Sequence, residues 1–200
     1  MSVRTVLVNF LLSIMLLTGT VIKCKGQGQA LMIGKSAYFE FHSNFWINLH
    51  HFLYQQAQGS QAKKLREDGN RLLDIGEDAI RPALSLSEAE RLTSAIAYYN
   101  NHLIGKSLPQ LGNLRTWLEG QSHKRPITDT TFTANYTKIV NDFSPVYKMH
   151  YWPTHNAQNA RVVNTHIKIL QQIEKEAISK LEQLAGYRWP GARVRIELTA

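Results

Sequence analysis

The chain has 200 residues, an apolar fraction of 44% and a charged fraction of 19%, which is sufficient for one folded domain with its own core. These values exclude a chain that is disordered over most of its length. The formal charge is +8, yet beyond the first thirty residues there are 20 basic and 15 acidic residues without a dense Lys/Arg run. We therefore expect no nucleic-acid partner, because a basic stripe and a binding motif are both missing from the sequence.

The first thirty residues have the order of regions that is typical of a secretory signal peptide. Arg4 precedes an apolar run over residues 6–22, and a small-residue cleavage site follows at 28–30. We expect cleavage there and a secreted or periplasmic protein with no stable membrane span. The alternative is an uncleaved membrane anchor, flanked by Lys23 and Lys25. Cleavage would also remove the single cysteine, and with it disulfide and thiolate chemistry.

Residues 41–54 form the densest stretch of large side chains, with three histidines and five aromatic residues in fourteen positions. Ser43 or Asn44 can cap a helix that runs to about Gln58 and ends at Gly59. At about 100° per residue, its apolar face consists of Phe45, Leu49, Phe52 and Leu53.

The neighbouring histidines of this helix cannot both point into one site. Trp46 and His50 flank the apolar face, whereas His51 is turned away by a further step of about 100°, beside Asn48 and Gln55. His42 shares the edge of His50 one turn before Trp46, or it lies in the preceding loop.

The middle of the chain predicts shorter elements. Residues 60–83 are polar and read as a loop with short helices around 62–68 and 76–82. Ser87–Glu90 has the spacing of a capping box, and the helix that it opens ends at Gly105.

Two further segments lead to the long C-terminal helix. Residues 108–120 predict one or two helical turns. Residues 130–143 predict a helix that Ser144–Pro145 restarts, since proline is tolerated at a first helical position. Trp152–Pro153 then predicts a break.

The last helix runs from about residue 156 to 185, with Gly186 as its C-cap. Residues 193–198 then alternate as a strand with one buried face. Its partner is the segment at 37–41, another chain, or a sheet that begins where this sequence stops. We predict a mainly α fold for residues 31–200: one irregular bundle of about five helices with a long C-terminal helix and a short terminal strand.

Three landmarks resemble a group of uncharacterised secreted bacterial proteins. They are the opening motif HSNFWxNLHHFLY at residues 42–54, YWPTHN at 151–156, and the end from Trp189–Pro190 to Arg193–Val194. In longer members of this group, the strand leads to a zincin-type His-Glu-x-x-His helix. The resemblance implies an N-terminal helical region that packs against a separate catalytic region. It implies no peptidase activity for this chain, because His-Glu-x-x-His is absent from the sequence.

A histidine–aromatic cleft is the candidate ligand site. Zinc would suit these side chains, and the sequence implies no other cofactor. If His42 and His50 lie in one helix, they are about 12 Å apart along its axis and cannot share an ion. The alternative is that these histidines are partly buried and hydrogen-bonded to backbone or tyrosine. The candidate set is His42, Trp46, His50, Tyr54, His102, His150, Tyr151 and His155.

The sequence contains no complete catalytic motif, so two functions stay open. One is the non-catalytic N-terminal part of a metallopeptidase-like protein. The other is a stand-alone helical module that binds a ligand or partner in the cell envelope.

Overall fold

The computed structural model describes residues 31–67, 83–106, 108–121, 126–128 and 134–200. The predicted signal peptide and the helix expected around 76–82 lie outside these residues. Helices predominate, which confirms the mainly α fold. In chain order the elements are β1 (Leu31–Lys35), β2 (Phe39–Ser43), α2 (Phe45–Glu67), α3 (Leu86–His102), α4 (Leu108–Glu119), α5 (Ala134–His150), α6 (Trp152–Ala185) and β3 (Val194–Glu197). Among the described helices, none combines the length and apolarity needed to cross a bilayer.

The terminal strand finds its partner within the chain. The sheet order is β1-β2-β3, with β1 antiparallel and β3 parallel to β2. Phe39 of β2 is opposite Val194 of β3. Of the three partners that the sequence left open, the N-terminal segment is therefore the correct one. The hairpin strand β1 was not predicted from the sequence.

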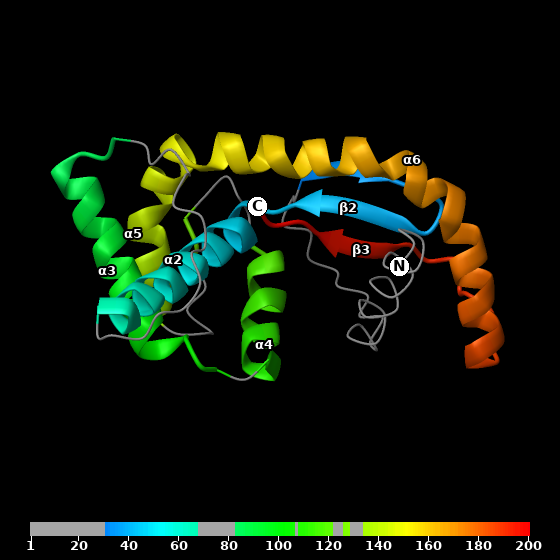
Figure 1. Ribbon diagram of the computed structural model, residues 1–200, viewed down its shortest axis with the longest axis horizontal. Helices are drawn as coiled ribbons and strands as arrows, with labels where there is room; N and C mark the ends of the chain where they lie inside the picture. Colours follow the sequence, from blue (N-terminus) through cyan, green and yellow to red (C-terminus); the bar gives the residue numbers. More distant parts are fainter. Residues whose placement is uncertain (1–30, 68–82, 107, 122–125, 129–133) are drawn as a thin grey trace.

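The helix α6 connects the two halves of the molecule. Figure 1 shows it running along the sheet at one end and beside the other helices at the opposite end. Over the sheet, Leu170 and Ile178 of α6 pack on Phe39. A second and larger core lies between the helices, where Leu49 and Leu53 of α2 are fully buried. Both fall on the face of α2 that the sequence predicted as apolar.

The prediction that the first helix ends at Gly59 is wrong. Helix α2 continues to Glu67 and includes the short helix expected around 62–68. Gly59 does not adopt a positive φ; it is exposed, and a Cβ at this position would have no neighbouring atom within 4 Å. A glycine there costs about 1 kcal/mol relative to alanine, which good helix-forming neighbours offset.

The predicted restart at Ser144–Pro145 is also wrong, because α5 continues through Pro145. A proline inside a helix deprives the carbonyl four residues earlier of its hydrogen bond. That carbonyl belongs to Asn141, and the hydroxyl of Ser144 donates to it at 3.0 Å. The lost backbone bond is replaced locally, so the helix does not break.

Three other boundaries shift. Helix α4 is longer than the one or two turns expected. Helix α6 begins at Trp152 rather than near 156, with Pro153 in its first turn, and it ends at Gly186 as predicted (φ 71°). The capping box of α3 uses Ser85 and Glu88, two residues before the predicted pair.

Candidate functional site

His42 lies in β2 and not in the helix of the opening motif. Strand alternation places it on the sheet face opposite Phe39 and Phe41. Its Nε2 is 3.6 Å from Oε2 of Glu40, and neither ring nitrogen makes a hydrogen bond. Its neighbour across the parallel pair is Glu197, whose pKa is raised by burial.

His50 is enclosed by tyrosines from α3 and α5. Its Nδ1 is 2.9 Å from Oη of Tyr99 and 3.2 Å from Oη of Tyr136. Burial, and then the charge of neighbouring His51, lower the pKa of His50 to about 4. The neutral imidazole accepts a hydrogen bond from the tyrosine pair, whose own pKa values are raised by burial. This arrangement is typical of a satisfied core histidine.

The two aromatic members of the opening motif have different roles. Trp46 is buried in the helical core, with its ring edge-to-face against Phe45 at 5.0 Å. Tyr54 packs at the border of the core, with its ring 6.2 Å from that of His50. His50 and Tyr54 are therefore neighbours, whereas Trp46 lines no cleft with them.

His150, the last residue of α5, contacts the start of α3, whereas His102 is the last residue of α3. Nε2 of His150 is 2.9 Å from Oε1 of Glu88, the capping-box glutamate. The hydrogen bonds from the Ser85 backbone and from His150 lower the pKa of Glu88 to about 2. His102 is exposed and its ring lies 4.6 Å from that of Tyr98.

His155 and Tyr151 pack beside α2. The ring of Tyr151 is 4.4 Å from Phe52, and the ring of His155 is 5.7 Å from it. Nδ1 of His155 is 2.9 Å from the hydroxyl of Tyr147. Burial, followed by the charge of His51, lowers the pKa of His155.

The candidate histidines thus do not converge. They lie in different surroundings, and within the described ranges no three His, Cys, Asp or Glu side chains gather as metal ligands. Of the two readings left open above, His42 and His50 are not placed together as possible zinc ligands, because one lies on the sheet and the other in the helical core.

A buried network of asparagines, which the sequence analysis did not predict, binds the residues after β3 to helices α2 and α6. Nδ2 of Asn159 donates to Ser43 Oγ, Asn48 Oδ1 and the carbonyl of Leu198, all within 3.2 Å. Asn48 also donates to the carbonyl of Leu198 at 2.9 Å and accepts from the backbone N–H of Ala200. We call these residues the asparagine clamp.

One signal of the clamp was present in the sequence. Asn159 is four residues before Val163, so it stands on the apolar stripe of the long helix. The prediction that Asn48 points away with His51 is wrong: Asn48 is buried against α6 and the residues after β3.

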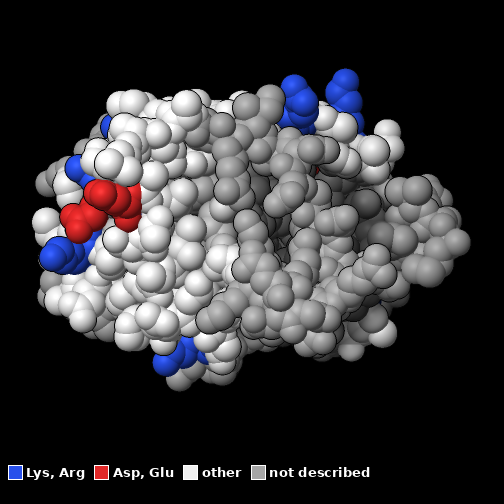
Figure 2. Space-filling model, turned by 60° about the vertical axis from the view of Figure 1, so that its left-hand side comes forward, with Lys and Arg blue, Asp and Glu red and all other residues white. Residues whose placement is uncertain are grey.

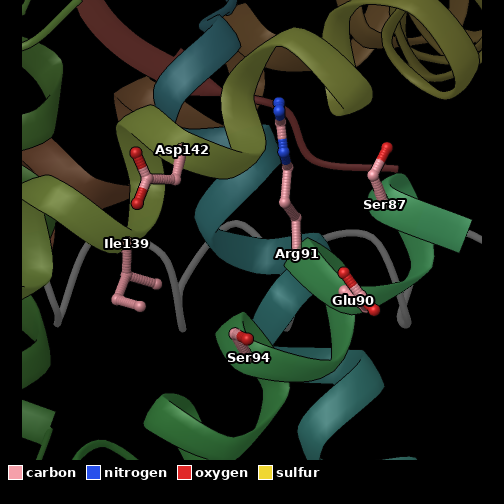
Figure 3. Close-up of a pocket in the computed structure, with 6 residues that line it drawn as sticks. All are labelled: Ser87, Glu90, Arg91, Ser94, Ile139 and Asp142. Atoms are coloured by element: carbon pink, nitrogen blue, oxygen red, sulfur yellow. The ribbon is translucent and has the colours of Figure 1, made fainter.

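A shallow groove separates α3 from α5. Its volume is about 400 Å³, and Figure 3 shows Arg91 and Asp142 extending from opposite helices. The remaining lining residues are Ser87, Glu90, Ser94 and Ile139. A guanidinium between hydroxyls and carboxylates can hold a small polar or anionic group at the surface.

Charged side chains are sparse on the described part of the face in Figure 2. They form one acidic group with basic neighbours and a few isolated basic groups at the rim, rather than a broad patch of one sign. The absence of a nucleic-acid partner stays a prediction.

Comparison with protein-family models, curated proteins and solved structures gives no match. Any function must therefore be argued from the residues and their geometry.

Proposed function

We propose that the chain is a secreted or periplasmic helical module without a catalytic centre of its own. It serves as the N-terminal part of a metallopeptidase-like protein, next to a separate catalytic region. The proposal is based on the separation of the candidate histidines in the fold. Two of them, His50 of α2 and His155 of α6, are hydrogen-bonded to tyrosine hydroxyls. Side chains used in this way stabilise helix packing and are not poised for proton transfer or metal chemistry.

The asparagine clamp supports the same role. It fixes Leu198 and Ala200 against α2 and α6, so the chain after β3 has a defined direction. Amide side chains that bind buried backbone groups give a rigid junction, because each unpaired group would cost about 1–3 kcal/mol. A rigid junction is what a catalytic region would need in order to be positioned by this module.

The experiment combines the purified chain with a His-Glu-x-x-His protein encoded downstream of it. We expect no peptide hydrolysis by the chain alone, a stable complex by gel filtration, and higher peptidase activity in the complex. Zinc-dependent peptide hydrolysis by the chain alone would refute the proposal, as would a catalytic protein that neither binds the chain nor responds to it. The Glu→Gln variant of the partner's motif is the inactive control.

A second function, a stand-alone binding module of the cell envelope, is favoured by the groove between α3 and α5. Arg91 would bind an anionic group there. Thermal unfolding with anionic envelope components should then show a ligand-dependent rise that Arg91→Ala abolishes. Arg115→Ala is the matched control, since Arg115 is an exposed arginine on α4 that pairs with Glu119. If the ligand raised the unfolding temperature equally in the Arg91→Ala and Arg115→Ala variants, the groove would be excluded as the binding site.

A further inference from the structure

Strand β3 has one paired edge and one open edge. On one side it pairs with β2, and among the described strands none pairs with its other side. Figure 1 shows β3 as an outer strand of the sheet. The backbone N–H groups of Val194 and Leu198 donate to carbonyls at β2, at 2.8 and 2.9 Å. Strand alternation therefore turns the N–H and C=O groups of Arg195 and Glu197 toward the open edge.

This open edge lacks the bulge and the proline that disrupt strand pairing. At the other edge of the sheet, β1 is bulged between Met32 and Gly34, whereas β3 is regular and has no proline. The backbone of β3 is also accessible. The side chain of Glu197 is 1% exposed, yet the residue as a whole is half-buried, so its exposed area is main chain. An accessible edge of this kind is a template for another strand.

The charges of β3 select a partner strand with the same sequence. Val194 and Ile196 pack on the core under α6, so Arg195 and Glu197 lie on the other face of the sheet. When two β3 strands pair antiparallel about Ile196, Arg195 of each copy is opposite Glu197 of the other. The neighbouring registers that use the same backbone groups place Arg195 opposite itself or Glu197 opposite itself. Like charges directly opposite each other destabilise a strand pair, so the charges favour the first register.

Glu197 also has an acceptor atom that its own chain does not use. Its Oε1 accepts a hydrogen bond from Nε of Arg195 at 2.6 Å. Its Oε2 is buried and has no hydrogen-bond partner in the described part of the chain. A buried carboxylate oxygen without a donor is unfavourable. The Arg195 side chain is 35% exposed and its guanidinium has five N–H donors, so Arg195 of a second copy, one strand spacing away, can supply the donor.

We propose that β3 is a self-association edge, at which two copies of the chain pair their β3 strands antiparallel about Ile196 and form one continuous sheet. Arg195 and Glu197 of each copy exchange backbone hydrogen bonds and pair their charges with the same residues of the other copy. The contact is symmetric, as in most homodimers. It is also small, because β3 has four residues, so the dimer forms reversibly. This inference goes beyond the proposed function and does not depend on it.

The first test traps the dimer at its centre with a disulfide. The background is Cys24→Ser, which removes the single cysteine of the chain. Ile196→Cys should give a covalent dimer on mild oxidation, because opposite residues of a non-hydrogen-bonded pair have Cα atoms about 4.5 Å apart, within disulfide range. Val194→Cys is the matched control on the same face of β3. It should stay monomeric, since its two cysteines would be about 13 Å apart. No covalent dimer of Ile196→Cys, or equal cross-linking of Val194→Cys, would overturn the proposal.

The second test exchanges the charges and needs no cysteine. By analytical ultracentrifugation, the wild-type chain should dimerise as its concentration rises. Arg195→Glu and Glu197→Arg should each weaken the dimer at least about tenfold, because like charges then stand opposite each other. An equimolar mixture of these two variants should form a heterodimer, since their charges are complementary. Lys168→Glu, at an exposed position of α6, is the control and should dimerise like the wild type. Circular dichroism verifies that each variant is folded.

Hydrogen exchange identifies what pairs with the edge. The amides of Arg195 and Glu197 should gain protection as the concentration of the chain rises. A wild-type chain that stays monomeric throughout would overturn the proposal. Protection that appears only after the downstream His-Glu-x-x-His protein is added would also overturn it, because the edge would then bind a strand of that protein. That last result would leave the proposed function standing.

Discussion

Replacing Gly34 by alanine tests how closely β1 packs on α6. A Cβ built at Gly34 would lie 2.5 Å from Cγ1 of Val163, closer than real Cβ atoms approach other atoms. Val163 is buried, so it cannot turn into solvent. Either the strand or the helix must shift, and overpacking of this kind costs about 1–3 kcal/mol. We therefore expect Gly34→Ala to lower Tm by about 2–12 °C for a chain of this size.

The assay is urea unfolding followed by circular dichroism, arranged as a double-mutant cycle with Val163→Ala. Val163→Ala alone should also destabilise the protein, because it removes buried methyl groups. In the double variant the smaller side chain makes room for the new methyl group. The two effects should consequently fall short of additivity, with an interaction energy of about 0.5–3 kcal/mol.

Gly59→Ala is the matched control. A Cβ at this helical position of α2 would meet no atom within 4 Å. We expect the substitution to stabilise the protein by about 0.5–1 kcal/mol, through helix propensity alone. The reasoning would be refuted if Gly34→Ala left stability unchanged, or if its effect simply added to that of Val163→Ala.

Three further predictions concern the clamp, a buried histidine and a helix cap. Asn159→Ala should reduce the free energy of unfolding by about 1–3 kcal/mol or more, since it removes a buried donor from several acceptors; Asn164→Ala, on the exposed side of α6, should change it by less than about 0.5 kcal/mol. The pKa of His50 falls from 6.5 to about 4 on folding. Neutral His50 therefore makes its full contribution to the free energy of unfolding above pH 6.5, and this contribution is lost as the pH falls toward 4. Urea unfolding across this pH window should show that the free energy of unfolding of the wild-type protein decreases by up to about 3 kcal/mol. The His50→Gln variant should lack this decrease and the His102→Gln variant should keep it; equal pH slopes in all three proteins would contradict the prediction. Ser85→Ala should destabilise α3 by about 1 kcal/mol, measured in the same way, because Ser85 and not Ser87 is the N-cap.

The amphipathic pattern was a good guide to the helices that pack on the core. The buried face of α2 and the C-cap of α6 followed from side-chain period and glycine chemistry alone. Gly59 and Pro145 misled because their effects are local, whereas both helices are supported along their length by tertiary packing. β1 was missed because it has a glycine at its bulge and no strict alternation, and it gains its pairing only from β2.

The candidate site depended on which element each histidine occupies. His42 ends on the far face of a sheet because the helix starts at Phe45, after the predicted cap at Asn44, and the residues just before it form strand β2. The partners of His50 and His155 are tyrosines distant in sequence or on another helix, and a single chain contains no signal for such pairs.

The parallel pairing of β2 and β3 has a consequence for the order of folding. The residues that meet at the sheet and the clamp are about 150 positions apart in sequence. Closing so long a loop carries a large entropic cost that is recovered only when the strands and α6 dock together. The helical core, built from nearer neighbours, should form first and the sheet last. Until then, Phe39 and the unpaired edge of β2 stay exposed, and this interval is when the protein is most open to aggregation.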